Sequence, residues 1–509
     1  MIEIRSAIWF YYSGAWHLCP DVLQDPAPVW EFGLPGNGPM DLVADTGILS
    51  FALDNSSSNA AGLAGYYSTG HPDCPAWFVD GLPVKVICTR QDTFVSATRF
   101  LGVMTDARPT SGVFEEAIVE VECHDWMDYA SIQKLGQLAI QTSKRADEAL
   151  TTALLDFPIQ PAAVDFDEGK ETWPKIFDTD DSMKMTMAAL FQKLARNEGG
   201  GYIFLEGDGT LRFDNRHARP ATATAAFTLD ATGATPMNEL DVSWSRKEIK
   251  NRVEANINLG RTDTTATTVI WKLQKTFALS AGQELILTCP YRDPATGARI
   301  SATEVVDPLV GGTHIKFGSV DDGSSNDLIG SLIFPLDVGG NTTEITLTNT
   351  GTVSGYVNFI ELIGKGIYTY EPMMLEAEDA ASIAARGELL LPVKLEQIVN
   401  PNTAHAYAVS LKQQLANPAR EIEGVRFLAN FSDEFMTAAM TAEVNIRFAV
   451  VEGQTGTDIE LFACRLKFEQ EGPLLWVEII PAPAATVNYF IWDQAPGATY
   501  GWDAGRWAF

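Results

Sequence analysis

The sequence predicts a mainly β protein with minor α/β parts, and three observations carry this prediction. Short runs in which apolar and polar residues alternate fill the first 125 residues, with Gly, Pro, Asn and Asp between them. Residues 128–220 change to helical spacing followed by a hairpin. Alternation then returns over most of the remaining chain. At 509 residues the chain is too long for one ordinary core, so two to four domains are expected.

The first 125 residues predict antiparallel strands. Residues 84–88, 96–102 and 117–123 alternate or nearly alternate, which is the pattern of an antiparallel barrel or sandwich. Residues 54–70 are rich in Ser, Asn, Ala and Gly and predict a long loop or arm.

Two helices are predicted next. Apolar residues at helical spacing predict one helical segment over residues 129–154, ended by Pro158 and Pro161. A second helix is predicted over residues 182–197, ended by glycines 199–201. The apolar face of this helix is formed by Met183, Met187, Leu190, Phe191 and Leu194. The candidates for its N-cap are Asp180, Asp181 and Ser182.

A hairpin and a second β region follow the helices. Residues 202–206 and 210–213 are strand-like, and Gly207-Asp208-Gly209 supplies turn residues that tolerate positive φ. Strands are expected at 241–245 and 251–257, and residues 262–370 are all-β by pattern.

The last part of the chain mixes helices and strands. Short helices are predicted at 379–387 and at 403–416, the latter stopped by Pro418, and strands from 425 to 480. Phe490-Ile-Trp-Asp493 and Tyr500-Gly-Trp-Asp503 then form a weak aromatic repeat. Such aromatics are expected to anchor on the body of the protein or on a neighbouring one.

The charge excludes one class of partner. The net charge is −30, from 36 basic against 66 acidic residues, so stable binding of nucleic acid is not expected. An acidic surface fits a channel wall that nucleic acid passes without adhering, and it fits ordinary solubility equally well. No apolar run approaches the roughly 18 residues of a membrane helix, and the first residues do not read as a signal peptide. The chain is therefore expected to fold in a cytoplasm.

The cysteines and histidines do not predict a metal site. The six cysteines are scattered without a CxxC motif, and buried reduced thiols are the expected state. His71 with Cys74, and His124 with Cys123, are the close pairs, and neither has further ligands nearby in the sequence. The six histidines, at 17, 71, 124, 217, 314 and 405, lie far apart, so a triad would have to be assembled by the fold.

Acidic clusters are the remaining candidates for chemistry. Paired carboxylates can hydrolyse glycosides, but 66 acids produce many pairs by chance. The clusters are Asp165, Asp167 and Glu168; Asp178, Asp180 and Asp181; and Asp321 and Asp322. The second stands where a helix start attracts acids. With no HExxH, GxSxG, Walker or dinucleotide motif, the sequence predicts no enzyme and no catalytic, cofactor-binding or metal-binding residue.

Residues 187–217 resemble a segment of a known family. A helix ends in Glu198-Gly-Gly, and an aromatic strand, an Asp-Gly turn and Leu211-Arg-Phe follow. This resembles the tail hub, or baseplate hub, proteins of long-tailed bacteriophages of the siphophage type. The segments 100–103, 119–125, 251–253 and 348–357, and Ala404 with Tyr407, are similar to parts of the same family.

The resemblance implies a fold and an assembly. It implies two antiparallel β-barrel domains joined by a helical linker and a helix–hairpin, with a β-rich insertion in the second half. It also implies a homotrimeric ring at the tail tip of the virion, assembled in the host cytoplasm. The implied partners are the distal tail protein, the tape-measure protein and a receptor-binding fibre or spike. The ring would hold the distal end of the tail tube and close or guide the channel for genome ejection.

These expectations divide the chain into five parts. They are a first barrel (1–127), a helical linker with helix–hairpin (128–220), a second barrel with insertion (221–375), a C-terminal α/β hub domain (376–485) and an aromatic tail (486–509). Two alternatives to a structural hub stay open. One is a virion-associated glycan hydrolase that uses an acidic pair. The other is a carbohydrate-binding protein whose block 262–370 presents Tyr291, Phe317 or Tyr356 to a sugar.

Overall fold

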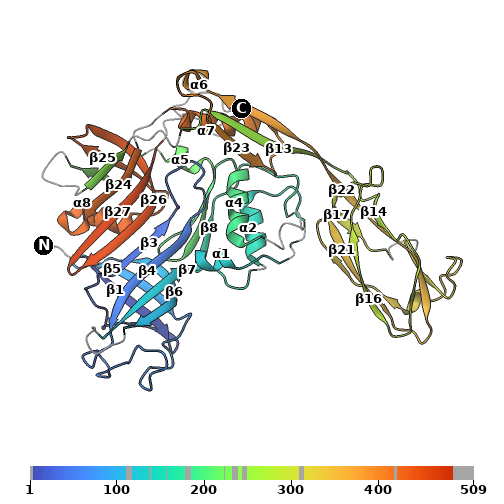
Figure 1. Cartoon of the computed structure of the whole chain (residues 1–509), viewed down its shortest axis with the longest axis horizontal. Coiled ribbons are helices and arrows are strands. Elements are labelled where there is room, and N and C mark those ends of the chain that lie inside the picture. The colour runs from blue at the N-terminus through green and yellow to red at the C-terminus, as the bar shows by residue number, and fades with distance from the viewer. Residues whose placement is uncertain are drawn as a thin grey trace.

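Figure 1 shows a computed structural model of the chain. It describes residues 4–110, 117–136, 138, 140–155, 157–177, 185–222, 224–231, 239–243, 249–308, 314–417 and 421–484. A large sheet fills the left of the view, and a small α/β unit lies beside it. A unit of strands and helices crosses the top, and an outer sandwich projects to the right.

The first half of the large sheet comes from the N-terminal residues. Its strands are β1 (Ile4–Tyr12), β2 (Ala15–Leu18), β3 (Val29–Gly33), β4 (Asp45–Asp54), β5 (Pro83–Arg90), β6 (Ser96–Pro109) and β7 (Ile118–Asp125). They lie in the order β3-β4-β7-β6-β5-β1-β2, and all neighbours are antiparallel. The strands predicted at 84–88, 96–102 and 117–123 are confirmed. The long loop predicted over 54–70 is also present, and it extends over residues 55–82.

The second half comes from two distant stretches of sequence. Its strands are β11 (Thr228–Asp230), β12 (Glu239–Ser243), β24 (Glu421–Leu428), β25 (Arg447–Glu452), β26 (Thr457–Glu471) and β27 (Leu474–Pro483). The order is β12-β24-β27-β26, with β25 and then β11 beyond β26. Because β3 also pairs with β26, the two halves form one sheet of 13 strands over a shared core.

One helix of the second half was not predicted. Helix α8 (Asp433–Thr441) lies where the sequence predicted continuous strands, so that prediction was wrong. The Ser432 hydroxyl caps its start by accepting from the Phe435 N–H, and Phe435 and Met436 are buried. At nine residues, the helix is too short for its spacing to stand out between strands.

The α/β unit follows β7. It contains α1 (Trp126–Ile132), α2 (Ala146–Leu155), β8 (Ala163–Phe166), α4 (Met187–Asn197), β9 (Tyr202–Leu205), β10 (Thr210–Asp214) and α5 (Ala218–Ala221). Its sheet has the order β8-β10-β9, and the predicted hairpin is confirmed by the β9–β10 pairing. The predicted turn also holds, with Gly209 at φ +88°.

The first predicted helix is two helices. Between α1 and α2 the backbone is extended and makes bridges from Lys134, Gln141 and Lys144 to residues 173–186. Helical spacing was therefore a misleading signal there, because Leu135 and Leu138 are buried in a segment that forms β-bridges with residues 173–186 of the same chain. Helix α4 begins at Met187, and the Thr186 hydroxyl caps it. The predicted N-cap candidates Asp180, Asp181 and Ser182, and also Met183, lie outside the described residues.

The unit at the top of Figure 1 packs three strands against a helix. It contains β13 (Arg252–Thr262), β22 (Gly355–Glu378), β23 (Leu390–Leu395), α6 (Ala380–Arg386) and α7 (Pro401–Leu415). Helices α6 and α7 confirm the two short helices that were predicted. Their core joins Ala404 and Leu411 of α7 to Val253 and Ile257 of β13.

The outer sandwich is the insertion of the second half. It contains β14 (Thr268–Lys272), β15 (Phe277–Leu279), β16 (Glu284–Pro290), β17 (Ser301–Val306), β18 (Ile315–Gly318), η1 (Ile329–Ser331), β19 (Leu332–Ile333), β20 (Leu336–Val338) and β21 (Thr342–Asn349). One sheet is built on β22 and the other on β21, with a separate apolar core. A two-stranded ribbon of β13 and β22 connects it to the body (Figure 1). Residues 369–374 on this ribbon are exposed.

The fold class is thus confirmed as mainly β, with antiparallel sheets that dominate. Within the described residues, the strand pairings leave each half of the large sheet open, without a pair that closes it into a barrel. The second half of the large sheet takes strands from both the predicted 221–375 and 376–485 regions. The aromatic repeat at 490–503 lies outside the described residues.

Candidate functional site

The first acidic cluster is divided among three neighbours. Asp165 lies 3.7 Å from the Arg212 Nε, and Glu168 lies 3.4 Å from an Arg145 Nη. Asp167 accepts a hydrogen bond from the Asn215 N–H. Each carboxylate is held by a different group, which favours a structural role over a catalytic pair.

The other two clusters add no chemistry. Asp178, Asp180 and Asp181 lie outside the described residues. In the exposed turn that follows β18, Asp322 accepts from the Ser324 N–H at 2.8 Å, which is a turn-forming bond. Within the described part of the chain, no three His, Cys, Asp or Glu side chains gather into a group that could hold a metal ion.

Buried cysteines and one histidine are fixed in the sheet. Five of the six thiols are buried as expected, while Cys74 is half-buried. His124 lies 3.0 Å from the Glu122 carboxylate through Nε2 and 3.3 Å from Asp128 through Nδ1. Because carboxylates occupy both ring nitrogens, His124 has none left to activate a nucleophile.

Three carboxyl groups, two of them buried and the third half-buried, have raised pKa values. Burial raises the pKa of Asp125 to about 8, although its side chain accepts from the Gly47 and Met127 N–H groups. Burial also raises the pKa of Glu198 to about 7 and that of Glu206 to about 7. Glu206 nevertheless bonds to Arg212 at 2.9 Å. Each is held by groups of the fold, backbone N–H groups for Asp125 and Glu198 and Arg212 for Glu206, so they bear on stability.

The solvent-facing side of the large sheet, called here the polar face, runs across both halves. Cross-strand partners share a face, so the paired rows Glu469–Val29–Ser50–Glu122–Asp106 and Glu478–Lys467–Glu31–Ile48–His124 define it. Its charged residues in these rows and next to them are Glu31, Asp106, Glu120, Glu122, Glu469 and Glu478, with Arg108, Arg426, Arg465 and Lys467. Acids outnumber bases on this face.

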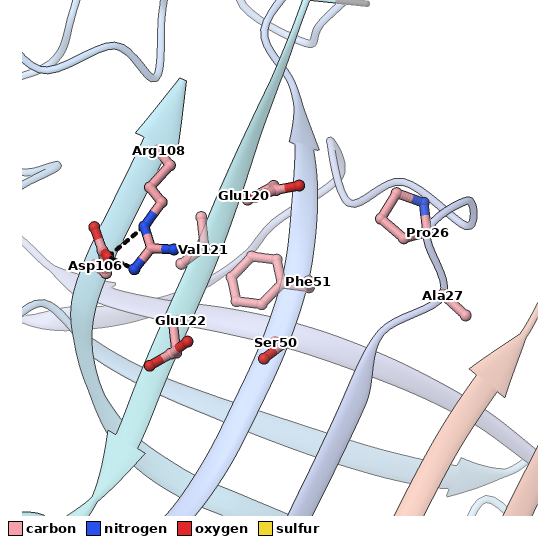
Figure 2. Close-up of a pocket in the computed structure, with 9 residues that line it drawn as sticks. All are labelled: Pro26, Ala27, Ser50, Phe51, Asp106, Arg108, Glu120, Val121 and Glu122. Carbon is pink, nitrogen blue, oxygen red and sulfur yellow. Dashed lines mark hydrogen bonds and ion pairs between the residues drawn. The ribbon is translucent and has the colours of Figure 1, made fainter. Parts of the chain in front are cut away.

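A groove crosses the polar face in the first half. Figure 2 shows side chains from three adjacent strands along it, with Pro26 and Ala27 at one side. Its floor follows β4 and β7, and the Asp106–Arg108 ion pair on β6 stands at the other side. The groove holds about 200 Å³, and its lining has three acids and one arginine, so it offers little to a nucleic acid.

The joint between the halves has contacts on both faces of the large sheet. Residues 29–33 of β3 pair antiparallel with residues 465–469 of β26. On the core side, Trp30 stacks on Phe468 with ring centroids 5.4 Å apart. On the polar face, Arg465 pairs with Glu31 at 2.5 Å. Gly33, at φ +127°, lets β3 approach the Cys464 carbonyl, which a Cβ would overlap.

The two halves repeat one arrangement of five strands. The order β3-β4-β7-β6-β5 in the first half corresponds to β12-β24-β27-β26-β25 in the second. When the five strands of each half are numbered along the chain, both halves have the spatial order 1-2-5-4-3. Strand β6 therefore corresponds to β26, and β3 corresponds to β12.

The repeat extends to single hydrogen bonds. In the first half, the Gly81 N–H donates to the Met104 carbonyl at 2.9 Å, just before a bulge between Met104 and Asp106. In the second half, the Asn445 N–H donates to the Ala463 carbonyl at 2.7 Å, just before a bulge after Ala463.

The backbone at this point is alike as well. Gly81 has φ +79° and Asn445 has φ +67°. Glycine and asparagine are among the residues that adopt positive φ most readily, and they occupy this same place in the two halves. The halves are thus copies of one backbone design with different side chains.

Asn445 is further held by an arginine. The Arg219 guanidinium donates to the Asn445 Oδ1 and, at 2.8 Å, to the Tyr202 hydroxyl. It also lies over the Tyr202 ring, 3.8 Å from the centroid. Asn445 in turn donates to Asp214 at 2.5 Å. This network fastens the second half to the α/β unit.

The outer sandwich bears on the carbohydrate alternative. Tyr291 and Phe317 are fully buried in its core, and the Tyr291 hydroxyl bonds to Thr343 and to the Gly339 carbonyl. Tyr356 is half-buried on β22. Two of the three aromatics proposed as a sugar platform are therefore core residues.

Comparison with known proteins finds likeness in fold alone. No family model and no curated protein matches the sequence. The structure resembles the 43 kDa tail protein of prophage MuSo2 from Shewanella oneidensis, at 10% identity and a TM-score of 0.49, over 94% of this chain and 98% of that one. It also resembles a tail protein from Neisseria meningitidis MC58, at 10% identity and a TM-score of 0.48, over 94% of this chain and 96% of that one.

A third solved structure is of the same kind. Prophage tail protein gp18 from Listeria monocytogenes matches at 8% identity and a TM-score of 0.42, over 94% of each chain. These structures are tail proteins, the class that the sequence resembles. At such identities and TM-scores below 0.5, the likeness does not carry their function to this chain. Among the described helices, none is long and apolar enough to cross a membrane.

Proposed function

We propose that this chain is a structural component of a bacteriophage tail, the hub at the tail tip, of which three copies form a ring. The ring connects the tail tube to a fibre or spike and closes or guides the channel through which the genome leaves. The chain has no catalytic role in this proposal.

The repeat within the large sheet is the observation that carries the proposal. Two copies of one five-strand arrangement stand side by side in a single sheet, joined through β3 and β26. A chain with two alike halves makes a ring of three copies nearly sixfold. Such a ring can match a sixfold tube on one side and a threefold fibre or spike on the other.

The charge of the polar face supports a channel wall. Six acids and four bases lie in the rows named above and next to them, within a chain of net charge −30. Like charge along a wall keeps a passing nucleic acid from adhering. The polar face is continuous across the joint, so a ring of such sheets would present one acidic lining.

The outer sandwich supports a second role at the periphery. It has its own core and is connected to the body through the exposed ribbon of β13 and β22. A separately folded module on a ribbon is suited to reach a fibre, or another tail protein, without disturbing the sheet. The distal tail protein, the tape-measure protein and a receptor-binding fibre or spike are the proposed partners, and the virion tail tip is the proposed location.

The native mass of the purified protein tests the proposal first. Light scattering after gel filtration, over a range of concentrations, should give three times the 55.5 kDa chain mass, and imaging should show a ring with a central pore. A monomer at every concentration, with and without a co-expressed distal tail protein, would contradict the hub.

The two alternatives are tested separately. Zymography on cell wall and capsule should be negative for the hub, and a cleared zone would support a hydrolase. Glycan-array binding that is lost when residues 264–365 are replaced by a short turn would support a carbohydrate-binding role for the sandwich. The absence of binding in the full chain leaves the hub as proposed.

A further inference from the structure

We propose that β12 of one copy pairs antiparallel with the end of β6 in a neighbouring copy, so that the large sheet continues from chain to chain. This inference rests on the proposed ring and names the strands that close it. The repeat of the two halves leads to it, because the joint inside the chain shows how one half attaches to the other.

The in-chain joint defines the contact. The first strand of one half, β3, pairs with the part of β26 that follows the bulge. By the correspondence of the halves, the same contact made between copies would use β12 in place of β3. It would use the part of β6 after its own bulge in place of residues 465–469.

The end of β6 offers the required edge. Residues 106–109 pair with β7 on one side, while β5 pairs only with residues 96–103 of β6. Because the Thr110 N–H donates to the Ile118 carbonyl on β7, the backbone groups of Ala107 and Pro109 point away from β7. Pro109 has no N–H, so it can offer a partner strand its carbonyl alone and the pairing lacks one ladder bond there. Among the described residues, no strand pairs with Ala107 on this side.

Strand β12 offers the complementary edge. Among the described strands, β24 is its sheet partner, and its other side lies at the end of the sheet. Leu240 and Val242 pack toward the core, as Trp30 does in β3, while Glu239 and Asp241 are exposed on the other face. An edge strand with acids is poorly suited to pair with a copy of itself.

The charges of the two edges are complementary. Arg108 stands on the polar face with 69% of its side chain exposed. The register of the in-chain joint, carried over, puts Thr110 opposite Asp241 and Arg108 two residue pairs away, as its diagonal neighbour on the same face. The in-chain joint contains an arginine–carboxylate pair of the same kind, between Arg465 and Glu31.

The side chains explain why this second joint lies between copies. The in-chain joint buries Leu466 and Phe468, whereas the corresponding positions of β6 are Ala107 and Pro109. Less apolar area is available for burial there, so the contact is weaker and suits a reversible assembly. The same backbone geometry thus serves folding at one joint and assembly at the other.

Cysteine cross-linking of the full chain tests the pairing. In a Cys74→Ser background, Thr110→Cys with Asp241→Cys should give covalent multimers up to the mass of the ring after mild oxidation, on a non-reducing gel. A mixture of the two single-cysteine variants should stop at covalent dimers. The matched control, Ala15→Cys with Asp241→Cys, places one thiol on β2 at the opposite end of the sheet and should stay monomeric on the gel.

The outcomes separate this inference from the hub itself. A ring by light scattering that cross-links in the control and not in the Thr110–Asp241 variant would overturn the pairing and leave the hub standing. A monomeric wild-type chain would overturn both.

A charge exchange gives a second measurement that needs no oxidation. Arg108→Glu should weaken assembly about tenfold, and the added Asp241→Arg should restore it. Unfolding curves of both variants that match the wild type would exclude a folding defect. Failure of the second substitution to restore assembly, in a well-folded double variant, would contradict the pairing.

Discussion

The first and second halves of the large sheet share a strand order, a bulge and a residue of positive φ, but they use the edge after the bulge differently. In the second half this edge carries Leu466 and Phe468 and is filled by β3. In the first half it carries Ala107 and Pro109 and has no partner strand among the described residues. Two side chains therefore decide whether the same backbone arrangement makes a permanent contact within the chain or keeps an edge for a partner.

The largest expected effect is at the core of the in-chain joint. Trp30→Ala removes a fully buried indole that stacks on Phe468 and should cost about 4 kcal/mol of unfolding free energy. The matched change in the second half, Val242→Ala, removes a half-buried side chain and should cost about 1 kcal/mol. Guanidinium unfolding of the two variants checks the comparison, and equal losses would contradict the difference between the edges.

A steric change should separate β3 from β26. Gly33→Val places side-chain atoms against the Cys464 carbonyl at a backbone φ of +127°, and should cost roughly 3 kcal/mol. Gly136→Val is the control, because a Cβ there meets nothing within 4 Å. Loss of stability by urea unfolding in both variants would show that valine, and not the joint, is the cause.

The two positive-φ residues allow a smaller and sharper comparison. Gly81→Ala should cost about 1 kcal/mol, because alanine is strained at φ +79°. Asn445→Ala should cost about 2–3 kcal/mol, since it also breaks the bonds to Arg219 and Asp214. Thermal unfolding of both variants measures the difference, which is the contribution of the Arg219 network. A larger loss at Gly81 would remove that network as the explanation.

A further comparison concerns pH and is specific to the first half. The Asp125 pKa is raised to about 8, far above its value in an unfolded chain, so the folded protein holds this proton more tightly. Its contribution to stability is therefore full at low pH and is lost as pH rises toward 8. The corresponding residue of the second half is Pro483, which does not titrate.

Asp125→Asn should remove this dependence. Asparagine keeps an acceptor for the Met127 N–H and is a good N-cap, so the variant should match the wild type below about pH 4, where the unfolded chain also binds this proton. Above pH 8 it should be the more stable of the two, as measured by melting temperature across the range. Parallel curves for the two proteins would contradict the assigned pKa.

Local patterns predicted the local structure. Alternation gave β5, β6 and β7, and Gly207-Asp208-Gly209 gave the β9–β10 hairpin, because strand period and turn chemistry are carried by neighbouring residues. The helix prediction was wrong over residues 133–145, because this segment instead forms bridges with residues that come much later in the chain.

The assembly edges could not be predicted from sequence. The pairing of Asp241 with Gly424 joins distant stretches, and a period of two does not specify which strand is the partner. The acidic clusters were visible in the sequence, but whether Asp165 meets Arg212 or a substrate depends on the fold. The repeat of the halves is likewise a property of strand order, and the residue patterns did not predict it.

The ribbon of β13 and β22 has a consequence for how such a protein can diversify. At the outer end of the ribbon, the Asp263 N–H donates to the Gly366 carbonyl. The chain therefore enters and leaves the outer sandwich at adjacent points. Because the sandwich has a core of its own, a different module with closely spaced ends could replace it without changing a contact of the large sheet. Recombination at this one place would exchange the peripheral module while the rest of the protein stayed the same.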